Sequence, residues 1–333
     1  MNGISFLVTG ASGFLGRTIL AELLAAGLPI WGTDVGAKLE GCGIQYQRAD
    51  ITSAKGLRDV VAGAGVVIHA AGLAHIFSPE KESIERFHQI NCLGTENVAR
   101  AAAQAGVSHF IFISSVSVYG PYTNGVYDEK TACAPVGAYA QSKYEGELRA
   151  IEIAKHTSMA LTILRLATLY GEEDPGNINR LMRSIDRGRF VWIGDGNNRK
   201  SLLYKGDAAR ACRMVATSPA SGIRVFNVSG PPCTMREIVD TLARHLGRQP
   251  LPARVPGSVA LVLSRWASLL PVRKFESLRA TIRKWLAEDV YDTTRSEKEF
   301  GFKPEVGIEE GLRREVAWYR STDYADGRRW IVR

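Results

Sequence analysis

The 333-residue sequence lacks the patterns that mark several large protein classes. Its five cysteines, Cys42, Cys92, Cys133, Cys212 and Cys233, are scattered and form no CxxC pair, which excludes a recognisable disulfide framework or zinc site. We therefore expect no bound metal. No internal repeat or low-complexity tract occurs, and 45% of the residues are hydrophobic, so neither a disordered nor a fibrous protein fits. These absences leave a globular protein with one substantial core and an appended lobe.

Targeting and membrane signals are also missing. The N-terminus has no basic region followed by a long apolar stretch, and the apolar run from Ile4 to Val8 is only as long as a strand. We read no signal peptide, and unpaired cysteines suit a reducing compartment. The sequence therefore predicts a cytoplasmic protein without a membrane span.

Charge is unevenly distributed along the chain. Residues 1–150 contain 11 basic and 13 acidic side chains, whereas residues 151–333 contain 31 and 21. The basic half could face nucleic acid, an acidic membrane surface or an anionic small substrate, or it could be an ordinary solvated surface. Because no block of Lys and Arg is interleaved with aromatic residues, nucleic acid is the weakest of these options.

Short β-branched runs alternate with Ala-rich segments of 3.6-residue periodicity through the first 170 residues. This alternation predicts an α/β fold with a Rossmann-type, doubly wound parallel sheet in residues 1–170. Residues 171–333 would form a smaller C-terminal α/β substrate lobe, with some segments returning to the first domain. The predicted strands are Ser5–Thr9, Ile30–Thr33, Val66–His69, His109–Ser114 and Leu161–Leu166. The predicted helices include Leu15–Ala26, Gly94–Ala105, Met235–Leu246, Ser258–Leu270, Phe275–Ala287 and Ile308–Tyr319.

Three glycines at GxxGxxG spacing lie between the first predicted strand and the first predicted helix. Gly10 would permit a tight turn, Gly13 would let the backbone approach a pyrophosphate, and Gly16 would let the helix pack on the strand. The N-terminus of that helix adds a positive dipole that favours phosphate. The segment predicts a dinucleotide site that also includes Ser12, Phe14 and Leu15.

An acidic residue follows the second predicted strand at the position expected to bind ribose. The carboxylate of Asp34 can accept hydrogen bonds from the adenosine ribose hydroxyls and would repel a 2′-phosphate. No Arg or Lys lies beside it between Thr33 and Gly36, which favours NAD over NADP, although an ordinary surface aspartate is the alternative. Residues after the next two strands would line the adenine and the diphosphate: Asp50, Ile51, Ala70, Ala71 and Gly72.

Tyr139 and Lys143 form a YxxxK element whose i, i+4 spacing places both side chains on one face of a predicted helix. Because the ordinary pKa of a phenol is about 10, a proton carrier at neutral pH needs a nearby cation. Upstream, the segment from Ser114 to Gly120 ends a predicted strand with hydroxyls that can bind a substrate oxygen. Each pattern alone has an ordinary alternative, a helix surface pair or a helix cap.

Together and in this order, these motifs resemble the extended short-chain dehydrogenase/reductases, most closely the NAD-dependent nucleotide-sugar epimerases. The resemblance covers nearly the whole chain. It rests on TGASGFLG at 9–16, HAAG at 69–72, Asn91 before Gly94 and Thr95, SSVSVYG at 114–120, YAQSK at 139–143, LRLATLYG at 164–171 and EFGFKP at 299–304. It implies that Ser115 is the catalytic hydroxyl, Tyr139 the acid/base, and Lys143 the residue that lowers the Tyr139 pKa and holds the nicotinamide ribose. It also implies support or contacts for the cofactor from Asn91, Ser114 and Leu166.

The two residues after Ser115 bear on the reaction. Sugar 4,6-dehydratases resemble this segment but carry Asp and Glu there, and nucleotide-sugar decarboxylases tend to carry Glu at the second place. Val116 and Ser117 cannot do carboxylate acid/base work, so both reactions are disfavoured. The resemblance then implies a UDP- or TDP-hexose 4-epimerase, with transient C4 oxidation by hydride transfer to NAD and Tyr139 as the proton carrier.

A nucleotide-diphosphate sugar needs donors for its diphosphate. The family pattern places an Arg where this chain has Lys200, preceded by Arg199, which leaves open which of the two binds phosphate. Asn177 is similar to the residue that contacts the diphosphate or sugar, and Thr168 replaces the residue that approaches the sugar. With Ser115 and Ser117 these residues form the expected substrate set, but they do not identify the sugar.

Two other functions remain open. A 3β-hydroxysteroid-type or other secondary-alcohol dehydrogenase or ketoreductase shares the N-terminal motifs, and the apolar stretch within Val255–Pro271 could line an apolar pocket or lie on a membrane. An amphipathic helix packed on the lobe or on a neighbouring subunit is the simpler reading of that stretch. A catalytically silent NAD(H)-sensing regulator is the second alternative, against which the intact Ser115, Tyr139 and Lys143 argue.

The resemblance also implies a homodimer. The predicted helices Ser83–Ala105 and Ala140–Lys155 would lie on one face of the sheet and form a four-helix seam with a second copy. An exposed, wholly polar face on both helices would contradict this expectation.

Overall fold

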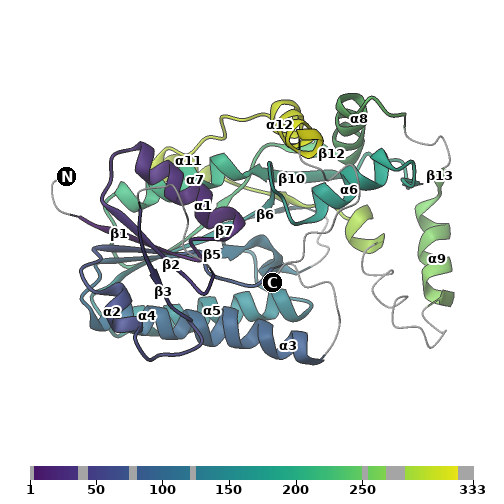
Figure 1. Cartoon of the computed structure of the whole chain (residues 1–333). Coiled ribbons are helices and arrows are strands. Elements are labelled where there is room, and N and C mark those ends of the chain that lie inside the picture. Colours follow the sequence, from purple (N-terminus) through teal and green to yellow (C-terminus); the bar gives the residue numbers. More distant parts are fainter. Residues whose placement is uncertain are drawn as a thin grey trace.

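The computed structural model describes residues 4–36, 44–74, 81–120, 125–249, 254–267 and 282–321 (Figure 1). Its centre is a seven-stranded sheet in the order β11-β7-β5-β4-β1-β2-β3, and every neighbouring pair is parallel. The strands are β1 (Phe6–Thr9), β2 (Ile30–Asp34), β3 (Gln45–Arg48), β4 (Val66–His69), β5 (His109–Ser115), β7 (Ala160–Leu166) and β11 (Ile223–Val228). The doubly wound Rossmann-type fold predicted from the sequence is confirmed.

Helices cover both faces of this sheet because its strands alternate their side chains between two apolar cores. Phe6 and Val8 of β1 join one core with α1 (Phe14–Ala25) and α7 (Lys205–Thr217). Leu7, between them, points into the other core. The helices of that second face are α2 (Leu57–Val61), α4 (Gly94–Gln104) and α5 (Ala138–Lys155), seen below the sheet in Figure 1. This layering aligns the carboxyl ends of β1, β2, β4 and β5, where ligands bind in open α/β sheets.

The helix predicted for Ser83–Ala105 is not regular. It consists of α3 (Lys81–Phe87), a π-helical segment η1 (His88–Leu93) and α4. Within η1 the carbonyl oxygen of Asn91 accepts a hydrogen bond from the Thr95 hydroxyl at 2.7 Å. This side-chain bond satisfies a carbonyl in the widened turn, and such segments are frequent at functional sites.

The C-terminal lobe has its own core beside the sheet. A three-stranded sheet combines β8 (Thr168–Tyr170), β10 (Arg199–Tyr204) and β12 (Pro232–Thr234). Two short pairs join β9 (Trp192–Ile193) to β13 (Arg254–Val255) and β6 (Val126–Tyr127) to β14 (Val290–Tyr291). The helices are α6 (Asn177–Asp186), α8 (Met235–Leu246), α9 (Gly257–Ala267), α11 (Thr294–Phe300) and α12 (Ile308–Ser321), and α6, α8 and α12 supply much of the lobe's core.

Part of the chain after residue 170 lies in the first domain. Helix α7 packs against α1, and β11 extends the central sheet beside β7, with Val228 opposite Leu166. Of the predicted helix Phe275–Ala287, residues 282–286 are helical and the earlier part lies outside the described residues, as do the last three residues of the predicted helix Ser258–Leu270. Within the described part of the chain, no helix combines the length and apolarity needed to cross a bilayer.

Candidate active site

The glycine-rich turn after β1 is so closely packed that two of its positions exclude a side chain. Gly10 has φ of +69°, and a Cβ added there would lie 2.5 Å from the Ala71 amide nitrogen. A Cβ on Gly16 would lie 1.9 Å from the Gly10 carbonyl oxygen. The start of α1 therefore rests directly on the turn, and the loop Ala70–Gly72 after β4 borders it. This cradle of backbone fits a dinucleotide pyrophosphate, which needs close approach to amide groups at a helix N-terminus.

Asp34 ends β2 beside the same turn. Its Oδ2 accepts hydrogen bonds from the Ser12 amide at 3.0 Å and the Ser12 hydroxyl at 2.6 Å, and its Oδ1 accepts one from the Val35 amide at 2.7 Å. The strand register also places Arg48 of β3 opposite Asp34, and its guanidinium donates to the Val35 carbonyl at 3.0 Å. Sequence reasoning missed Arg48, because the two residues become neighbours only through strand pairing.

The predicted adenine-side residues lie at the start of the segment after β3. Asp50 Oδ1 accepts the Thr52 amide and hydroxyl at 2.9 and 2.8 Å, which fixes a local turn. Ile51 is buried, and its carbonyl accepts the Asn97 side-chain amide at 3.0 Å. The turn is thus held to α4 rather than free.

A buried hydrogen-bond chain connects the glycine-rich turn to the π-helical segment. The Thr9 hydroxyl accepts the Ala71 amide at 3.2 Å and contacts His69 Nδ1 at 2.7 Å, and His69 Nε2 contacts the Thr95 hydroxyl at 3.1 Å. Since Thr95 donates to Asn91, it must accept from Nε2–H, which assigns the tautomer of His69. Burial, reinforced by the Lys143 charge, lowers the pKa of His69 to about 3, so the ring stays neutral.

Asn91 joins two of the motifs singled out in the sequence. Its Oδ1 accepts the Leu73 amide at 2.7 Å, and its Nδ2 donates to the Leu73 carbonyl at 2.9 Å and to the Ser142 hydroxyl at 3.0 Å. A Cβ on Gly72 would lie 3.2 Å from Asn91 Oδ1 and 3.6 Å from Lys143 Nζ. The loop after β4, the π-helical segment and the YxxxK helix therefore meet at one point.

Ser115 ends β5, and its side chain lies near enough to the phenol of Tyr139, at the start of α5, to affect the pKa of that phenol. Burial raises the pKa of Tyr139 above its ordinary value, and the Ser115 side chain opposes this rise. Lys143 donates to the Ile113 carbonyl at 2.5 Å and lies 4.4 Å from the centre of the Phe112 ring. Burial lowers the pKa of Lys143 to about 8, against the field of Glu147, so it stays charged at neutral pH. An effect of Lys143 on the Tyr139 pKa stays a prediction.

A buried ion pair that the sequence reasoning did not single out lies behind these residues. Glu147, one turn after Lys143, accepts hydrogen bonds from the Ser114 hydroxyl at 2.5 Å and from Arg165 at 3.0 and 2.7 Å. The Arg165 guanidinium lies 4.8 Å from the centre of the Tyr119 ring. The carboxylate ties the end of β5 to α5 and β7, which fixes the strand end that carries Ser115.

The positions after Ser115 form a short 3-10 turn, η2 (Val116–Tyr119), capped by Ser115 itself. The Ser115 hydroxyl accepts the Ser117 amide at 3.2 Å. The Ser117 hydroxyl oxygen is buried and makes no hydrogen bond within the described structure. This unsatisfied hydroxyl one turn from the Ser115–Tyr139 pair is suited to a polar ligand atom.

The predicted substrate residues of the lobe are not brought together to the same degree. Thr168 is half-buried at the start of β8, and Asn177 is exposed at the start of α6. Buried Lys200 donates to the carbonyls of Lys284 and Ala287 at 2.6 and 2.7 Å and pairs with Asp289 at 2.7 Å. Arg199 pairs with Glu288 at the surface. Both cations are therefore committed to protein acceptors in this structure.

A loop after β8 reaches from the lobe to the glycine-rich helix. Glu173 has φ of +68°, an unfavourable conformation for a residue with a side chain, and its carboxylate pairs with Arg17 of α1. Lys205 donates to the Glu172 carbonyl at 2.7 Å. Two buried carboxyls lie close by: burial raises the pKa of Asp174 to about 6 and raises that of Glu315 well above its ordinary value. Their sequence contexts carried no signal that would have found them.

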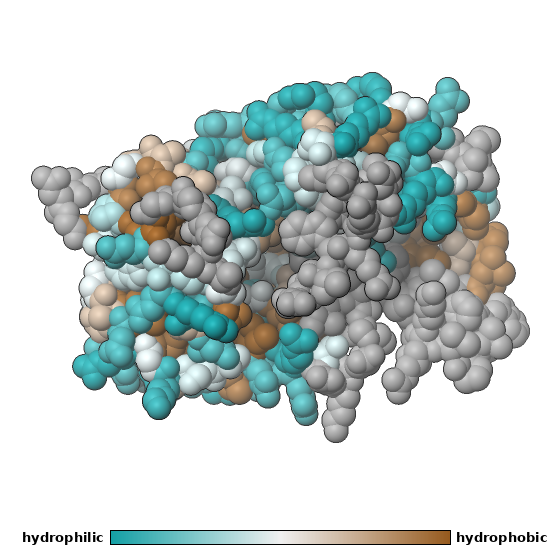
Figure 2. Space-filling model, in the orientation of Figure 1, coloured by the Kyte–Doolittle hydropathy of each residue, from teal (hydrophilic) through white to brown (hydrophobic). Residues whose placement is uncertain are grey.

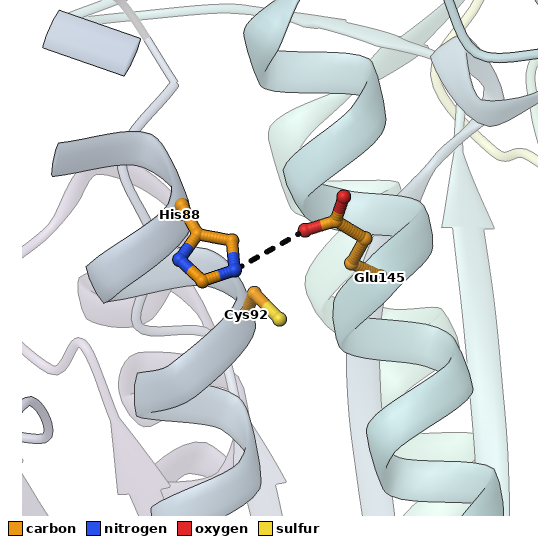
Figure 3. Close-up of side chains that lie close together, drawn as sticks. All are labelled: His88, Cys92 and Glu145. Atoms are coloured by element: carbon orange, nitrogen blue, oxygen red, sulfur yellow. Dashed lines mark ion pairs between the residues drawn. The ribbon is translucent and has the colours of Figure 1, made fainter. Parts of the chain in front are cut away.

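Figure 3 shows a group of metal-ligand residue types between η1 and α5, with His88 and Glu145 pointing toward each other. His88, Cys92 and Glu145 have potential ligand atoms within 4.8 Å of one another. His88 pairs with Glu145 at 3.5 Å, and the Cys92 thiol is hydrogen-bonded to Arg149. Because all three donors already have protein partners and two of them are half-exposed, we assign no metal to this group.

Comparisons of the sequence and of the fold with known proteins agree on the family of this chain. Residues 6–229 match the model of the NAD dependent epimerase/dehydratase family. The chain is 28% identical over 332 residues to 2-alkyl-3-oxoalkanoate reductase of Stenotrophomonas maltophilia (strain K279a), covering 93% of this chain and 98% of that protein. It is 28% identical over 322 residues to N-acetyl-alpha-D-glucosaminyl-diphospho-ditrans,octacis-undecaprenol 4-epimerase of Escherichia coli O157:H7, covering 94% of each. The solved structure of MoeE5 in complex with UDP-glucose and NAD superposes with a TM-score of 0.76 at 27% identity, covering 95% and 99% of the two chains.

Proposed function

We propose, on the premise that the chain belongs to the NAD dependent epimerase/dehydratase family, that it is an NAD-dependent 4-epimerase of a UDP- or TDP-hexose. The family and the intact Ser115, Tyr139 and Lys143 support an enzyme of the extended short-chain dehydrogenase/reductase type. A MoeE5 structure with UDP-glucose and NAD and a related 4-epimerase of a diphospho-linked sugar support the substrate class.

The residues present fit NAD on the observed geometry. Gly10 and Gly16 let the N-terminus of α1 rest directly on the turn, where a pyrophosphate would bind. Asp34 would accept the adenosine ribose hydroxyls, and Lys143 would hold the nicotinamide ribose. Bound NAD supplies a reversible hydride acceptor. The further cofactor contacts we propose are Ser12, Gly13, Phe14, Leu15, Asp50, Ile51, Ala70, Ala71, Gly72, Asn91, Ser114, Tyr139 and Leu166.

The chain's own residues would carry the proton and hold the oxygen. Tyr139 would remove the proton from the sugar C4 hydroxyl. It would return the proton after the 4-keto sugar has rotated in the site to present its other face. Ser115, whose side chain neighbours the phenol, would bind the same oxygen throughout. The buried Ser117 hydroxyl would offer a second donor nearby. The substrate would thus meet a preorganised, largely desolvated set of hydrogen-bond donors, which is the main source of rate enhancement in such sites.

The observation that carries the proposal is the Tyr139 phenol, whose pKa burial raises and the neighbouring Ser115 side chain lowers, together with Val116 and Ser117 at the two positions after Ser115. A dehydratase must protonate and deprotonate the carbons next to C4, and an epimerase need not. With no carboxylate at either position, the site can move one proton at one oxygen. Oxidation and reduction at a single carbon is the reaction that remains.

The experiment is NMR of the enzyme with NAD and each nucleotide sugar of a panel in D2O. Interconversion of C4 epimers, with hydrogen retained at C3, C4 and C5 and no net NADH, is expected. Tyr139→Phe should lower kcat about a thousandfold while NAD still binds, because the general acid/base is lost and the cradle is kept. Formation of a 4-keto-6-deoxy sugar, or full activity of Tyr139→Phe, would rule the proposal out.

A second candidate is a net ketoreductase or secondary-alcohol dehydrogenase. It is favoured by Lys200, whose three polar contacts are all with protein acceptors, so the expected diphosphate ligand is occupied. A related protein is named as a reductase of 2-alkyl-3-oxoalkanoates. Steady oxidation of NADH with a β-keto acid, and no epimer formation from any nucleotide sugar, would select this candidate.

We also propose a homodimer through α3, η1, α4 and α5. Large apolar side chains are exposed on these elements at Ile84, Leu93 and Leu148. Charged residues lie between them along the chain. Because these three side chains are apolar, the exposed side of the helices is not wholly polar. Light scattering of the wild type and of a Leu93→Glu/Leu148→Glu variant tests the assembly. The same molar mass for the wild type and the variant would contradict it.

A further inference from the structure

Helix α9 has exposed apolar side chains within the described part of the lobe. Val259, Val262 and Leu263, here called the α9 face, are 45%, 54% and 60% exposed, whereas Ala260 between them is buried. Their i, i+3, i+4 spacing places them on one side of the helix. Figure 2 shows hydrophobic surface at the right-hand edge, where Figure 1 places α9. Part of this helix packs inward, and the α9 face points away from the lobe.

Basic side chains lie on the segments that meet near the start of α9. The basic rim consists of the exposed residues Arg187, Arg189, Arg254, Arg283 and Lys284. Strand pairing puts Arg254 beside Trp192, and the rings of Phe190 and Trp285 lie 5.8 Å apart, which brings these segments together. Leu286 approaches the positions of both Gly194 and Gly257, so the helix that carries Arg283 and Lys284 borders the start of α9.

Acidic residues do not neutralise this region. Residues 254–267 and 282–287 contain four basic residues and no acidic one. On the adjoining segments, Asp186 is paired with Arg248, and Glu288 is paired with Arg199. Among the described residues of α9 and of the helix that borders its start, basic side chains therefore outnumber acidic ones.

We propose that the α9 face and the basic rim dock this protein peripherally on an anionic phospholipid bilayer. A short helix with one apolar side and basic surroundings lies in the interfacial plane, with its apolar side among the acyl chains and its cations at the headgroups. Charge complementarity selects a lipid surface of this kind over an uncharged apolar partner. An 11-residue helix cannot cross the bilayer, so the association is reversible.

Both components are needed for measurable binding. Each cation held near an anionic leaflet strengthens partitioning about fivefold, an effect that falls off with added salt. Three partly exposed aliphatic side chains contribute about tenfold or more when they enter the acyl region. The docking surface therefore predicts binding to anionic vesicles and weak binding to neutral ones.

The test is cosedimentation of the full chain with sucrose-loaded vesicles of phosphatidylcholine, with and without about 30% phosphatidylglycerol, at about 0.1 M NaCl. Binding to the anionic vesicles should be at least tenfold stronger than to the neutral ones and should fall at about 0.5 M NaCl. No detectable binding to the anionic vesicles would overturn the proposal.

Variants distinguish vesicle binding through the α9 face from nonspecific adsorption to vesicles. Val262→Glu/Leu263→Glu should weaken vesicle binding at least tenfold, and Arg187→Glu/Arg189→Glu should weaken it for anionic vesicles only. Leu24→Glu/Val126→Glu is the matched control, because both residues are exposed and lie elsewhere in the described structure. Equal binding by Val262→Glu/Leu263→Glu and the control overturns the proposal, as does a lipid-independent dimer that only Val262→Glu/Leu263→Glu dissociates.

This inference does not depend on the proposed activity. Turnover of a soluble substrate should be the same for all three double variants and the wild type, because none of the changed residues lies in the catalytic or cofactor site. A failure of epimerase activity would leave vesicle binding unaffected, and the reverse also holds. Unchanged melting temperatures confirm that the variants are folded.

Discussion

Buried polar groups in the dinucleotide-binding half and in the C-terminal lobe are satisfied in different ways. Around the glycine-rich turn, both nitrogens of His69 and every hydrogen-bonding atom of the Asn91 amide have partners. In the lobe, Glu315 Oε1 and Asn179 Oδ1 are buried without one. The first half also has two such atoms, Thr33 Oγ1 and Ser117 Oγ, but the chain of hydrogen bonds from the glycine-rich turn to η1 is complete. The described part of the lobe thus contains buried polar atoms that have no hydrogen-bond partner within it.

The strongest test of the dinucleotide-binding half is Gly16→Ala. The added Cβ would lie 1.9 Å from the Gly10 carbonyl oxygen, so the helix must move away from the turn. We expect NAD binding to be lost and the free energy of unfolding to fall by about 3 kcal/mol, the upper range for overpacking. Calorimetric titration with NAD and urea unfolding measure both effects.

Gly307→Ala is the matched control, because a Cβ there meets nothing within 4 Å. It should change neither NAD affinity nor stability by a measurable amount. If Gly16→Ala behaved like this control, the cradle would be loose, and the contrast between the two halves would disappear.

Lys200→Met tests whether the lobe's buried cation is structural or a ligand for diphosphate. Removing it leaves the Asp289 carboxylate and two carbonyls without their donor, which should cost about 2 kcal/mol in the free energy of unfolding. The neighbouring Arg199→Met, which breaks an exposed pair, should cost less than about 1 kcal/mol. Unchanged stability together with a tenfold higher KM for a nucleotide sugar would instead make Lys200, rather than Arg199, the diphosphate ligand that the sequence left open.

Glu315→Gln should change how the free energy of unfolding depends on pH. Since folding raises the pKa of Glu315, the fold favours its protonated form. That stability is fully present below the carboxyl's ordinary pKa and is lost as pH rises through the folded pKa. We therefore expect the variant to be more stable than the wild type at alkaline pH, with a gain that shrinks as the pH falls toward the ordinary carboxyl pKa, as measured by urea unfolding.

The exposed Glu310, paired with Arg313 and Arg314, has a pKa lowered to about 2 and serves as the control. Glu310→Gln should show no gain in stability toward high pH. Asp174, whose pKa is raised to about 6, should leave a smaller pH dependence of the same sign in Glu315→Gln. A pH-independent effect of Glu315→Gln would show that the buried carboxyl is solvated.

Asp34→Ser gives the smallest expected change. Loss of the carboxylate removes repulsion of a 2′-phosphate, and Arg48 on the paired strand is placed to attract one. We expect the preference for NAD over NADP to fall about tenfold, with weaker NAD binding because the bonds to Ser12 are lost. Fluorescence titration with both cofactors measures the ratio, and Asp34→Ser/Arg48→Ser should restore part of it if Arg48 is responsible.

Local patterns in the sequence were sufficient where the chain folds on itself locally. The predicted strands Val66–His69 and Leu161–Leu166 differ from the observed ones by at most one residue at either end. The glycine spacing, the loop at Ala70–Gly72 and the YxxxK element converge because parallel strands align their carboxyl ends. A β-strand–turn–helix pattern thus places a site without knowledge of distant contacts.

The remaining features depend on pairings that no local pattern encodes. The partners of Lys200 lie between residues 284 and 289, and Glu147 meets Arg165 only after α5 and β7 have packed. Strand β11 joins the central sheet from beyond the first part of the lobe, and Arg48 reaches Asp34 through strand register. The π-helical segment His88–Leu93 carries no composition that distinguishes it from an α-helix. These pairings determine which charged side chains are bound to other protein groups.

The single helix α5 carries Tyr139, Lys143 and Glu147 at successive intervals of four residues. A helix advances about 100° per residue, so inserting or deleting one residue between them would swing the downstream groups to a different side of the cylinder. The proposed proton carrier, the proposed ribose-holding amine and the buried carboxylate would be displaced in one step. Loops around this helix can therefore change length during evolution, whereas the length of its first three turns cannot.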